Sequence, residues 1–224
     1  TNGNTTFIDG SGQNILLTIE NDTTCEQLIQ NITFTNGNAQ NSNGYVLSVN
    51  NGKTKFSNCI FENNGYGTGN QLFRGSGIGL TYFEDCIVRY NSAENFAGIA
   101  TSTVIRTVLY QNSGWNNTGV LHECHAINCT VFGNAGGWMP NPWTVGGMNG
   151  GVAENCIFWN NEGNGGQQIY QAESVTYSIV QDGYEGEGNI DADPLFVNES
   201  AYNLNITELS PAIDAGNPDL NNNG

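Results

Sequence analysis

Basic residues are scarce in this chain: its 224 residues include five Lys and Arg against 21 Asp and Glu, a net charge of −16. Nucleic-acid binding needs a basic surface that neutralises phosphates, so we exclude nucleic acid as a partner. The same scarcity argues against tight binding of polyanionic glycans, unless calcium bridges the two acidic partners. Long apolar runs and a signal peptide are also missing, so we expect no membrane insertion and interpret the chain as a mature or excised fragment.

A short phrase recurs instead, for example as Asn58-Cys-Ile-Phe-Glu-Asn63 and Asn155-Cys-Ile-Phe-Trp-Asn160. The eight copies are separated by 27, 27, 27, 21, 22, 27 and 22 residues when aligned on Thr5, Ile32, Cys59, Cys86, Thr107, Cys129, Cys156 and Ser178. A period in the twenties, with strand-like apolar pairs and Gly/Asn turns, predicts a solenoid whose coils stack on one shared core.

Two apolar columns appear in this alignment, and both are expected to point inward because strand side chains alternate between faces. The first column is Phe7, Phe34, Phe61, Val88, Leu109, Val131, Phe158 and Val180. The second is Ile29, Phe56, Phe83, Val104, Ala126, Ala153 and Val175. An antiparallel sandwich also has many short strands, but it requires no constant column. We therefore predict an all-β, right-handed parallel β-helix of about eight coils over residues 1–185, closed by an irregular C-terminal segment, 186–224, on the last coils.

A third column consists of asparagine, at Asn64, Asn91, Asn112, Asn134 and Asn161. Asparagine tolerates the left-handed αL backbone, and stacked amides can bond along the coils. The column therefore predicts αL turns that carry an asparagine ladder.

The repeated phrase resembles that of secreted bacterial right-handed β-helix proteins of the pectate-lyase-like superfamily. The tail, with Asp193-Pro-Leu-Phe196 and Ser210-Pro-Ala-Ile-Asp-Ala-Gly216, resembles the closing segment after the last coils of such surface proteins. The resemblance implies an extracellular or cell-surface location and a longer surface polypeptide that continues beyond residue 224. It implies no single activity, because that superfamily includes lyases, hydrolases, adhesins and stalks.

The cysteines allow two interpretations. Cys59/Cys86 and Cys129/Cys156 fall at one inward position of adjacent coils, with Cα atoms ~4.8 Å apart, within the range that a disulfide bridges. Stacked cysteines also serve as small apolar fillers, and we expect free thiols. Cys25 and Cys124 lie several coils apart and cannot meet.

Catalytic residues are difficult to find in this sequence. Uronate lyases of this fold use a Lys or Arg base beside acidic calcium ligands, but no basic residue stands in an obvious acidic cluster. Arg89 aligns with Glu62 one coil earlier and is expected to form an exposed ion pair. The signatures of polygalacturonase-type hydrolases are missing. A different paired-carboxylate hydrolase stays open, although no spacing singles out a pair among Glu154, Glu162, Asp182, Glu185 and Glu187.

Metal-binding patterns are weak. The segment His122-Glu-Cys-His125 matches no zinc spacing, and its alternate residues would face opposite sides of a strand. Asp219-Leu-Asn-Asn-Asn-Gly224 matches only the first half of a calcium loop. We expect no metal site and no required cofactor, with calcium as the one ion to consider.

Aromatic residues give the clearest functional signal. Tyr110, Phe132 and Trp159 occupy one outward column in consecutive coils, and Trp115, Trp138 and Trp143 follow the same turns. Flat rings suit the apolar faces of neutral sugars, so we predict a carbohydrate site with Trp115, Trp138, Trp143, Tyr110 and Trp159 as stacking groups. The alternative is that the tryptophan loop folds over the outward column and buries it, because soluble proteins rarely expose such a patch.

The sequence therefore favours a non-catalytic surface module for carbohydrate recognition, adhesion or structural display. A polysaccharide lyase or glycoside hydrolase of the same superfamily is the alternative.

Overall fold

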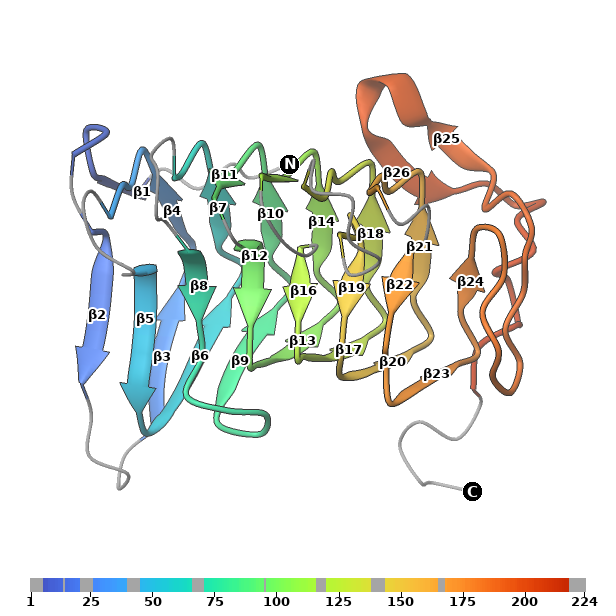
Figure 1. Ribbon diagram of the computed structural model, residues 1–224, viewed down its shortest axis with the longest axis horizontal. Coiled ribbons are helices and arrows are strands. Elements are labelled where there is room, and N and C mark those ends of the chain that lie inside the picture. The colour runs from blue at the N-terminus through green and yellow to red at the C-terminus, as the bar shows by residue number, and fades with distance from the viewer. Residues whose placement is uncertain are drawn as a thin grey trace.

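The computed structural model describes residues 6–13, 15–20, 26–39, 45–65, 71–94, 96–115, 120–137, 144–164 and 168–217. Over these residues the chain is an all-β parallel solenoid, in which three long sheets run side by side along the molecule (Figure 1). This confirms the predicted fold class, whereas the right-handed winding and the number of coils stay predictions.

Each coil contributes one short strand to each sheet. Sheet A contains β1 (Thr6–Asp9), β4 (Ile32–Thr35), β7 (Ile60–Glu62), β10 (Ile87–Arg89), β14 (Val108–Tyr110), β18 (Thr130–Phe132), β21 (Ile157–Trp159) and β24 (Ile179–Val180). Sheet B contains β2 (Leu17–Glu20), β5 (Tyr45–Asn51), β8 (Gln71–Arg74), β12 (Phe96–Ala100), β16 (Leu121–His122), β19 (Met148–Asn149) and β22 (Ile169–Tyr170). Sheet C contains β3 (Glu26–Gln30), β6 (Lys53–Ser57), β9 (Thr81–Glu84), β13 (Thr103–Ile105), β17 (His125–Ile127), β20 (Val152–Glu154) and β23 (Ser174–Thr176). A two-stranded sheet pairs β11 (Ser92–Ala93) with β15 (Ser113–Gly114).

The strand registers confirm both apolar columns from the second copy onward. Phe34 pairs with Phe61 in sheet A, and Ile29 pairs with Phe56 in sheet C, as the alignment predicts. For the first copy, the predicted alignment is wrong by one residue. Ile8, not Phe7, pairs with Phe34 and packs against the core, while Phe7 is 59% exposed. A one-residue shift moves every side chain of a strand to its other face.

Phenylalanine rings fill the N-terminal part of the core. The rings of Phe34 and Phe61 stack at 4.9 Å, and those of Phe56 and Phe83 stack at 4.9 Å. The two stacks meet edge to face, with Phe56 and Phe61 at 5.7 Å. Both geometries are favourable for aromatic rings, so the rings lock adjacent coils together.

The asparagine ladder is confirmed. The Nδ2 of Asn64 donates to Oδ1 of Asn91 at 3.0 Å, and the same bond joins each next pair as far as Asn161 at 2.9 Å. Each ladder amide also donates to a backbone carbonyl one coil earlier, such as that of Phe61 for Asn91 at 2.9 Å. Gln168 ends the ladder by accepting from Asn161 at 2.8 Å.

The predicted αL backbone is wrong for the ladder residues themselves. The residue with positive φ precedes each ladder position, and this column contains Asn63, Tyr90, Gln111, Gly133 and Asn160. A second αL column, with Asn31, Asn58, Asp85, Arg106, Asn128, Asn155 and Tyr177, lies at the turn between sheets C and A. Asparagine is therefore needed at the ladder positions for its side-chain hydrogen bonds and not for an αL backbone.

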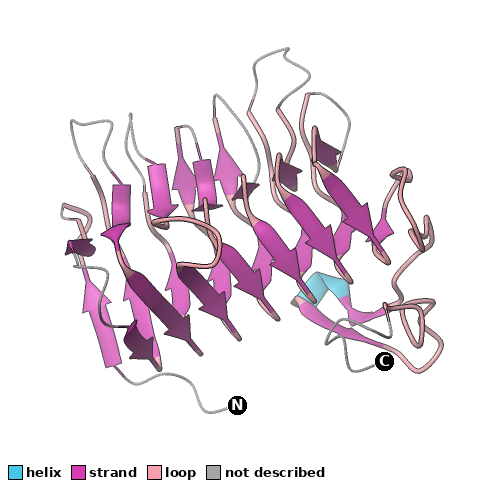
Figure 2. Cartoon of the chain, turned by 90° about the horizontal axis from the view of Figure 1, so that it is seen from below, coloured by secondary structure: helices cyan, strands magenta, loops and turns pink. Residues whose placement is uncertain are grey.

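An antiparallel hairpin of β25 (Phe196–Asn198) and β26 (Asn203–Ile206) lies at the C-terminal end of the solenoid (Figure 1). Its strands are joined by η1 (Glu199–Ala201), the short helical turn coloured cyan in Figure 2. Asn198 caps η1 by accepting the backbone N–H of Ala201 at 3.1 Å. We call residues 196–206 the closing hairpin. The described part of the chain contains no helix long and apolar enough to cross a membrane.

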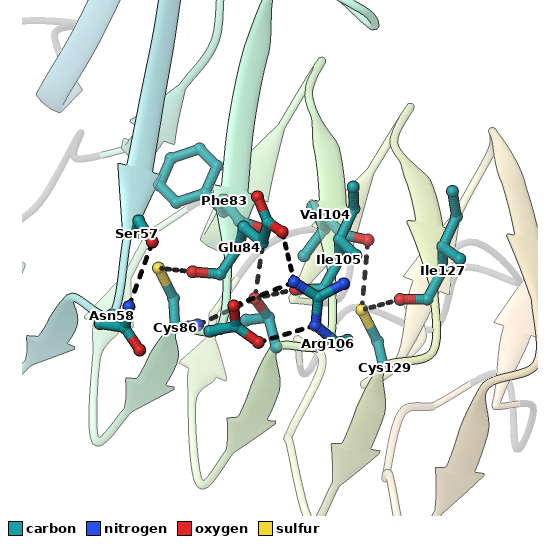
Figure 3. Close-up of polar contacts among 12 residues, drawn as sticks. Ser57, Asn58, Phe83, Glu84, Cys86, Val104, Ile105, Arg106, Ile127 and Cys129 are labelled. Carbon is teal, nitrogen blue, oxygen red and sulfur yellow. Dashed lines mark hydrogen bonds and ion pairs between the residues drawn. The ribbon is translucent and has the colours of Figure 1, made fainter. Parts of the chain in front are cut away.

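All five cysteines within the described ranges are free and buried: Cys59, Cys86, Cys124, Cys129 and Cys156. Cys25 lies outside those ranges. The thiols donate to backbone carbonyls, as Cys129 Sγ does to Val104 and Ile127 at 3.3 Å each (Figure 3). The cysteines therefore act as compact fillers of the core, and their thiols also satisfy backbone carbonyl groups.

These thiols should resist modification in the folded protein. Thiol reagents need an accessible thiolate, and all five described thiols are buried. At Cys124 burial also raises the pKa, to about 12. In a Cys25→Ser variant, we expect labelling by a thiol reagent at pH 8 to be on the order of 100-fold slower in buffer than in denaturant. Rapid labelling of the folded variant would show that the coils open easily.

Candidate functional site

The outward column of sheet A is aromatic where the sequence predicts it. Tyr110 pairs with Phe132, and Phe132 pairs with Trp159, so the three side chains follow one another across adjacent strands. This confirms the register of the predicted column.

The closing hairpin covers much of this column. Tyr202 stacks on Tyr110 at 5.0 Å, and Phe196 packs edge-on against Phe132 at 5.6 Å. As a result, Tyr110 is 7% and Phe132 is 5% exposed, and Trp159 is half-buried beside them. The prediction of an exposed ladder is wrong for Tyr110 and Phe132, because burying their apolar rings is favourable.

The predicted stacking groups do not form one exposed platform. Tyr110 and Trp159 belong to the apolar cluster under the closing hairpin, whereas Trp115 is 57% exposed. Trp138 and Trp143 lie outside the described residues, so the alternative, in which their loop covers the outward column, is not tested. The cover within the described residues is the closing hairpin.

A cleft of about 550 Å³ lies between the turn edge of β14, β18 and β21 and the closing hairpin. Its chemistry is mixed, with aromatic, amide and carboxylate side chains: Gln111, Phe132, Asn160, Glu162, Glu199 and Tyr202. We call this space the hairpin cleft. Its size and its few polar groups beside aromatic surface are typical of small-ligand sites.

The αL turn column positions the amides of the cleft. Gln111, Gly133 and Asn160 are the αL residues of three successive coils, with φ of 55°, 60° and 54°. Gln111 Nε2 donates to the Gly133 carbonyl at 3.0 Å, and a Cβ at Gly133 would come within 2.8 Å of that nitrogen. Glycine at this position leaves room for the Gln111 amide, which a larger residue would displace.

One amide joins the solenoid to the closing hairpin. Asn160 Nδ2 donates to the Glu199 carboxylate at 3.3 Å, and the Asn160 backbone N–H donates to Gln181 Oε1 at 2.7 Å. The first bond links Asn160 to Glu199 across the cleft, and the second anchors the Asn160 backbone to Gln181. The interaction holds the cleft together and leaves other carboxylate lone pairs of Glu199 available.

Trp115 is connected to this cleft through the strand that precedes it. It directly follows β15, and Ser113 of that strand pairs with Ala135, which lines the cleft. Ala135 pairs in turn with Glu162. Of the three predicted residues that the structure describes, Trp115 is the exposed ring, and its strand leads to the cleft.

A second cavity, of about 390 Å³, lies between the last strands of sheet A and residues 204–216. Its lining includes Asn155, Ile157, Tyr177, Ile179 and Leu204, and none of its lining residues is an acid or a base of the Lys/Arg type. The Asn155 amide is already engaged, because its Oδ1 accepts the Asn217 backbone N–H at 2.7 Å. Unlike the hairpin cleft, this cavity has no carboxylate side chain among the described residues that line it.

Charged residues cluster at the turn between sheets C and A (Figure 3). Glu84 bonds both Lys55 and Arg106, and Arg106 Nε also reaches Asp85 at 2.8 Å. The prediction that no basic residue lies in an acidic cluster is therefore wrong for Lys55 and Arg106. The hydrogen bonds that Arg106 donates to Asp85 and Glu84 raise the pKa of Arg106, and the bond that Lys55 donates to Glu84 lowers the pKa of Glu84. An arginine with a raised pKa is poorly suited to remove a proton.

Arg89 forms the predicted ion pair with Glu62, but the pair is partly buried and not exposed. Its guanidinium Nε donates to Glu62 at 2.7 Å, which confirms the ion pair between coils. The same guanidinium donates from Nη1 to the Tyr110 hydroxyl at 2.9 Å. Arg89 is thus engaged by partners of its own sheet.

The two histidines do not converge on a metal. Cys124 points into the core and donates to the Ile99 carbonyl at 3.3 Å, while His125 lies 3.3 Å from Glu154 on the outer face. Within the described ranges no three His, Cys, Asp or Glu side chains form a metal-binding group. The calcium-like segment that starts at Asp219 lies outside those ranges.

Comparison of the chain with protein-family models, with curated proteins and with solved structures gives no match.

Proposed function

We propose that this chain is a non-catalytic module of an extracellular or cell-surface protein and that it recognises carbohydrate in the hairpin cleft. The observation that carries the proposal is the cleft itself, in which amides and ring surface line one hollow of about 550 Å³. Sugars present apolar faces that pack on rings and hydroxyls that bond to amides and carboxylates. The acidic, base-poor composition and the superfamily resemblance support the extracellular setting.

Ion pairing of three basic side chains in the described part of the chain supports a binding role over a lyase. Arg106 and Lys55 are held in ion pairs, and Arg89 is held by Glu62. A stalk or display role without a ligand would use the same fold and would differ only in leaving the cleft empty.

A glycoside hydrolase is the second candidate, favoured by one observation. Glu162 and Glu199 line the same cleft, and a pair of carboxylates can cleave a glycosidic bond. Sugar-specific binding without turnover would favour recognition, whereas new reducing ends would favour hydrolysis. Unsaturated products formed with added calcium would favour a lyase.

Asn160→Gly tests the cleft, because glycine keeps the αL backbone and removes the amide together with its bond to Glu199. We expect about five-fold weaker binding of the neutral oligosaccharide that binds best in a calorimetric panel. The matched control is Asn128→Gly, the same exchange at an αL turn residue outside the cleft, where φ is 54°. Equal losses in both variants, or no loss in either, would contradict a site in the cleft.

The exposed ring of Trp115 gives a second test of the same site. If Trp115 flanks the bound sugar, Trp115→Ala should weaken binding several-fold and leave the unfolding transition unchanged, because the ring is 57% exposed. Unchanged affinity would remove Trp115 from the site.

A further inference from the structure

The charge of the hairpin cleft narrows the class of sugar that it accepts; this step rests on the proposed function. Two carboxylates, those of Glu162 and Glu199, line the cleft. Glu162 uses its backbone groups within the fold, donating to Asn134 and accepting from Gly136. Its carboxylate forms no hydrogen bond or ion pair with any part of the chain that the structure describes. Glu199 has one amide donor, Asn160, and no cationic partner among those residues.

No cation of the protein balances these carboxylates. Residues 107–224, which supply the whole lining, contain no Lys or Arg. Arg89 contacts Tyr110, which lies under the closing hairpin. Its guanidinium is already engaged, because Nε donates to Glu62 at 2.7 Å and Nη1 donates to the Tyr110 hydroxyl at 2.9 Å. The cleft therefore has a negative potential that the fold leaves uncompensated.

We propose that the hairpin cleft selects a saccharide that carries a protonated amine, an amino sugar without its N-acetyl group. The ammonium group supplies the positive charge that the two carboxylates lack. The ring of Tyr202 adds attraction, because cations are drawn to aromatic faces, and the amides of Gln111 and Asn160 bond the hydroxyls. A uronate would place a third negative charge in the same cleft and is rejected.

The decisive comparison uses three tetrasaccharides of similar size, built from glucosamine, N-acetylglucosamine or glucose. Isothermal titration should give the tightest binding for the glucosamine tetramer. Glu162→Gln and Glu199→Gln should each weaken that binding by about three-fold, and together by about ten-fold, as expected for solvent-accessible ion pairs. Binding of the two neutral tetramers should change by less than about 1.5-fold.

Glu208→Gln is the control for general attraction between a cationic sugar and an acidic protein. Glu208 is exposed and lies outside the cleft lining, so this variant has the same change in net charge. A tetramer of lysine serves as a cation without a sugar ring. It should bind more weakly than the glucosamine tetramer.

The possible failures are distinguishable. Equal affinity for glucosamine and glucose tetramers would overturn the charge selection and leave carbohydrate recognition standing. An equal loss in Glu208→Gln, or tight binding of the lysine tetramer, would reduce the effect to general electrostatics and also overturn the selection. If no tetrasaccharide binds, the proposed function fails together with this inference.

Discussion

Phe61→Ala is expected to lower the free energy of unfolding by about 4 kcal/mol. The Phe61 side chain is fully buried, and its ring lies 4.8–5.7 Å from the rings of Phe34, Phe56, Phe73 and Phe83. Alanine at this position would leave a cavity bordered by three adjacent coils, and the surrounding rings could collapse into it only in part. Urea denaturation followed by circular dichroism measures the change.

Phe7→Ala is the matched control. The side chain is 59% exposed, so we expect a change below about 0.5 kcal/mol for the same chemical exchange. A large loss at Phe7 would mean that β1 pairs in the register that the repeat alignment predicts, with Phe7 inside. The two variants together therefore test both the aromatic core and the register of the first strand.

Asn112→Ala should destabilise the fold by roughly 3 kcal/mol, although it removes only a small polar side chain. Asn112 is 1% exposed and stands in the middle of the asparagine ladder. Its Oδ1 accepts from the Asn91 backbone and side chain at 3.1 and 2.9 Å, and its Nδ2 donates to Val88 and Asn134 at 2.9 Å each. Alanine would remove these four buried hydrogen bonds. Asn91 Nδ2 keeps the Phe61 carbonyl, and Asn134 Oδ1 keeps the backbone N–H of residue 112, but the buried backbone N–H of Asn91 loses its acceptor, and that loss is the main cost.

The exchange Asn205→Ala provides the comparison, because Asn205 is an exposed asparagine on β26. It should change stability by less than about 0.5 kcal/mol. Asn112→Asp should be at least as harmful as alanine, since it keeps the acceptor but places a charge opposite Asn134 Oδ1. If Asn112→Ala were as mild as Asn205→Ala, water would have to enter the ladder and replace the amide.

The sequence predicts most of the solenoid because each coil repeats the same pattern of buried apolar positions. The columns through Phe34 and Ile29 are apolar in every coil, and strand register follows from keeping such columns inside. The first copy lacks this support: Thr5-Thr-Phe-Ile8 offers an apolar residue on either face. Pattern alone could not decide between Phe7 and Ile8, and the larger residue was the wrong choice.

The turns show a similar limit. In Asn63-Asn64 and Asn160-Asn161 both residues suit an αL backbone, so composition does not tell which one adopts it. The structure assigns αL to the first residue of each pair and the ladder bond to the second. Where Tyr90 or Gln111 occupies the αL position, the sequence contains no signal for it.

The hairpin cleft was only partly predictable. Its solenoid side is formed by the turns between the aromatic and asparagine columns, and the repeat pattern in the sequence indicates these turns. Its other side comes from Glu199 and Tyr202, about forty residues or more beyond the strands that they face. An irregular segment has no period, so its sequence does not reveal which sheet it covers. Only packing on Tyr110 and Phe132 determines that position.

The uneven distribution of charge has a consequence for how the whole rod is oriented. Residues 1–106 contain five basic and eight acidic residues, a net charge of −3, whereas residues 107–224 contain 13 acidic residues and no Lys or Arg, a net charge of −13. Since the coils follow one another along the long axis (Figure 1), this difference creates an electric dipole along that axis. Near a polyanionic layer we expect the less negative N-terminal coils to face the layer, which would leave the hairpin cleft facing the surrounding medium. High salt would shorten the range of this alignment to roughly a Debye length of 3 Å at 1 M, so the preferred orientation depends on ionic strength.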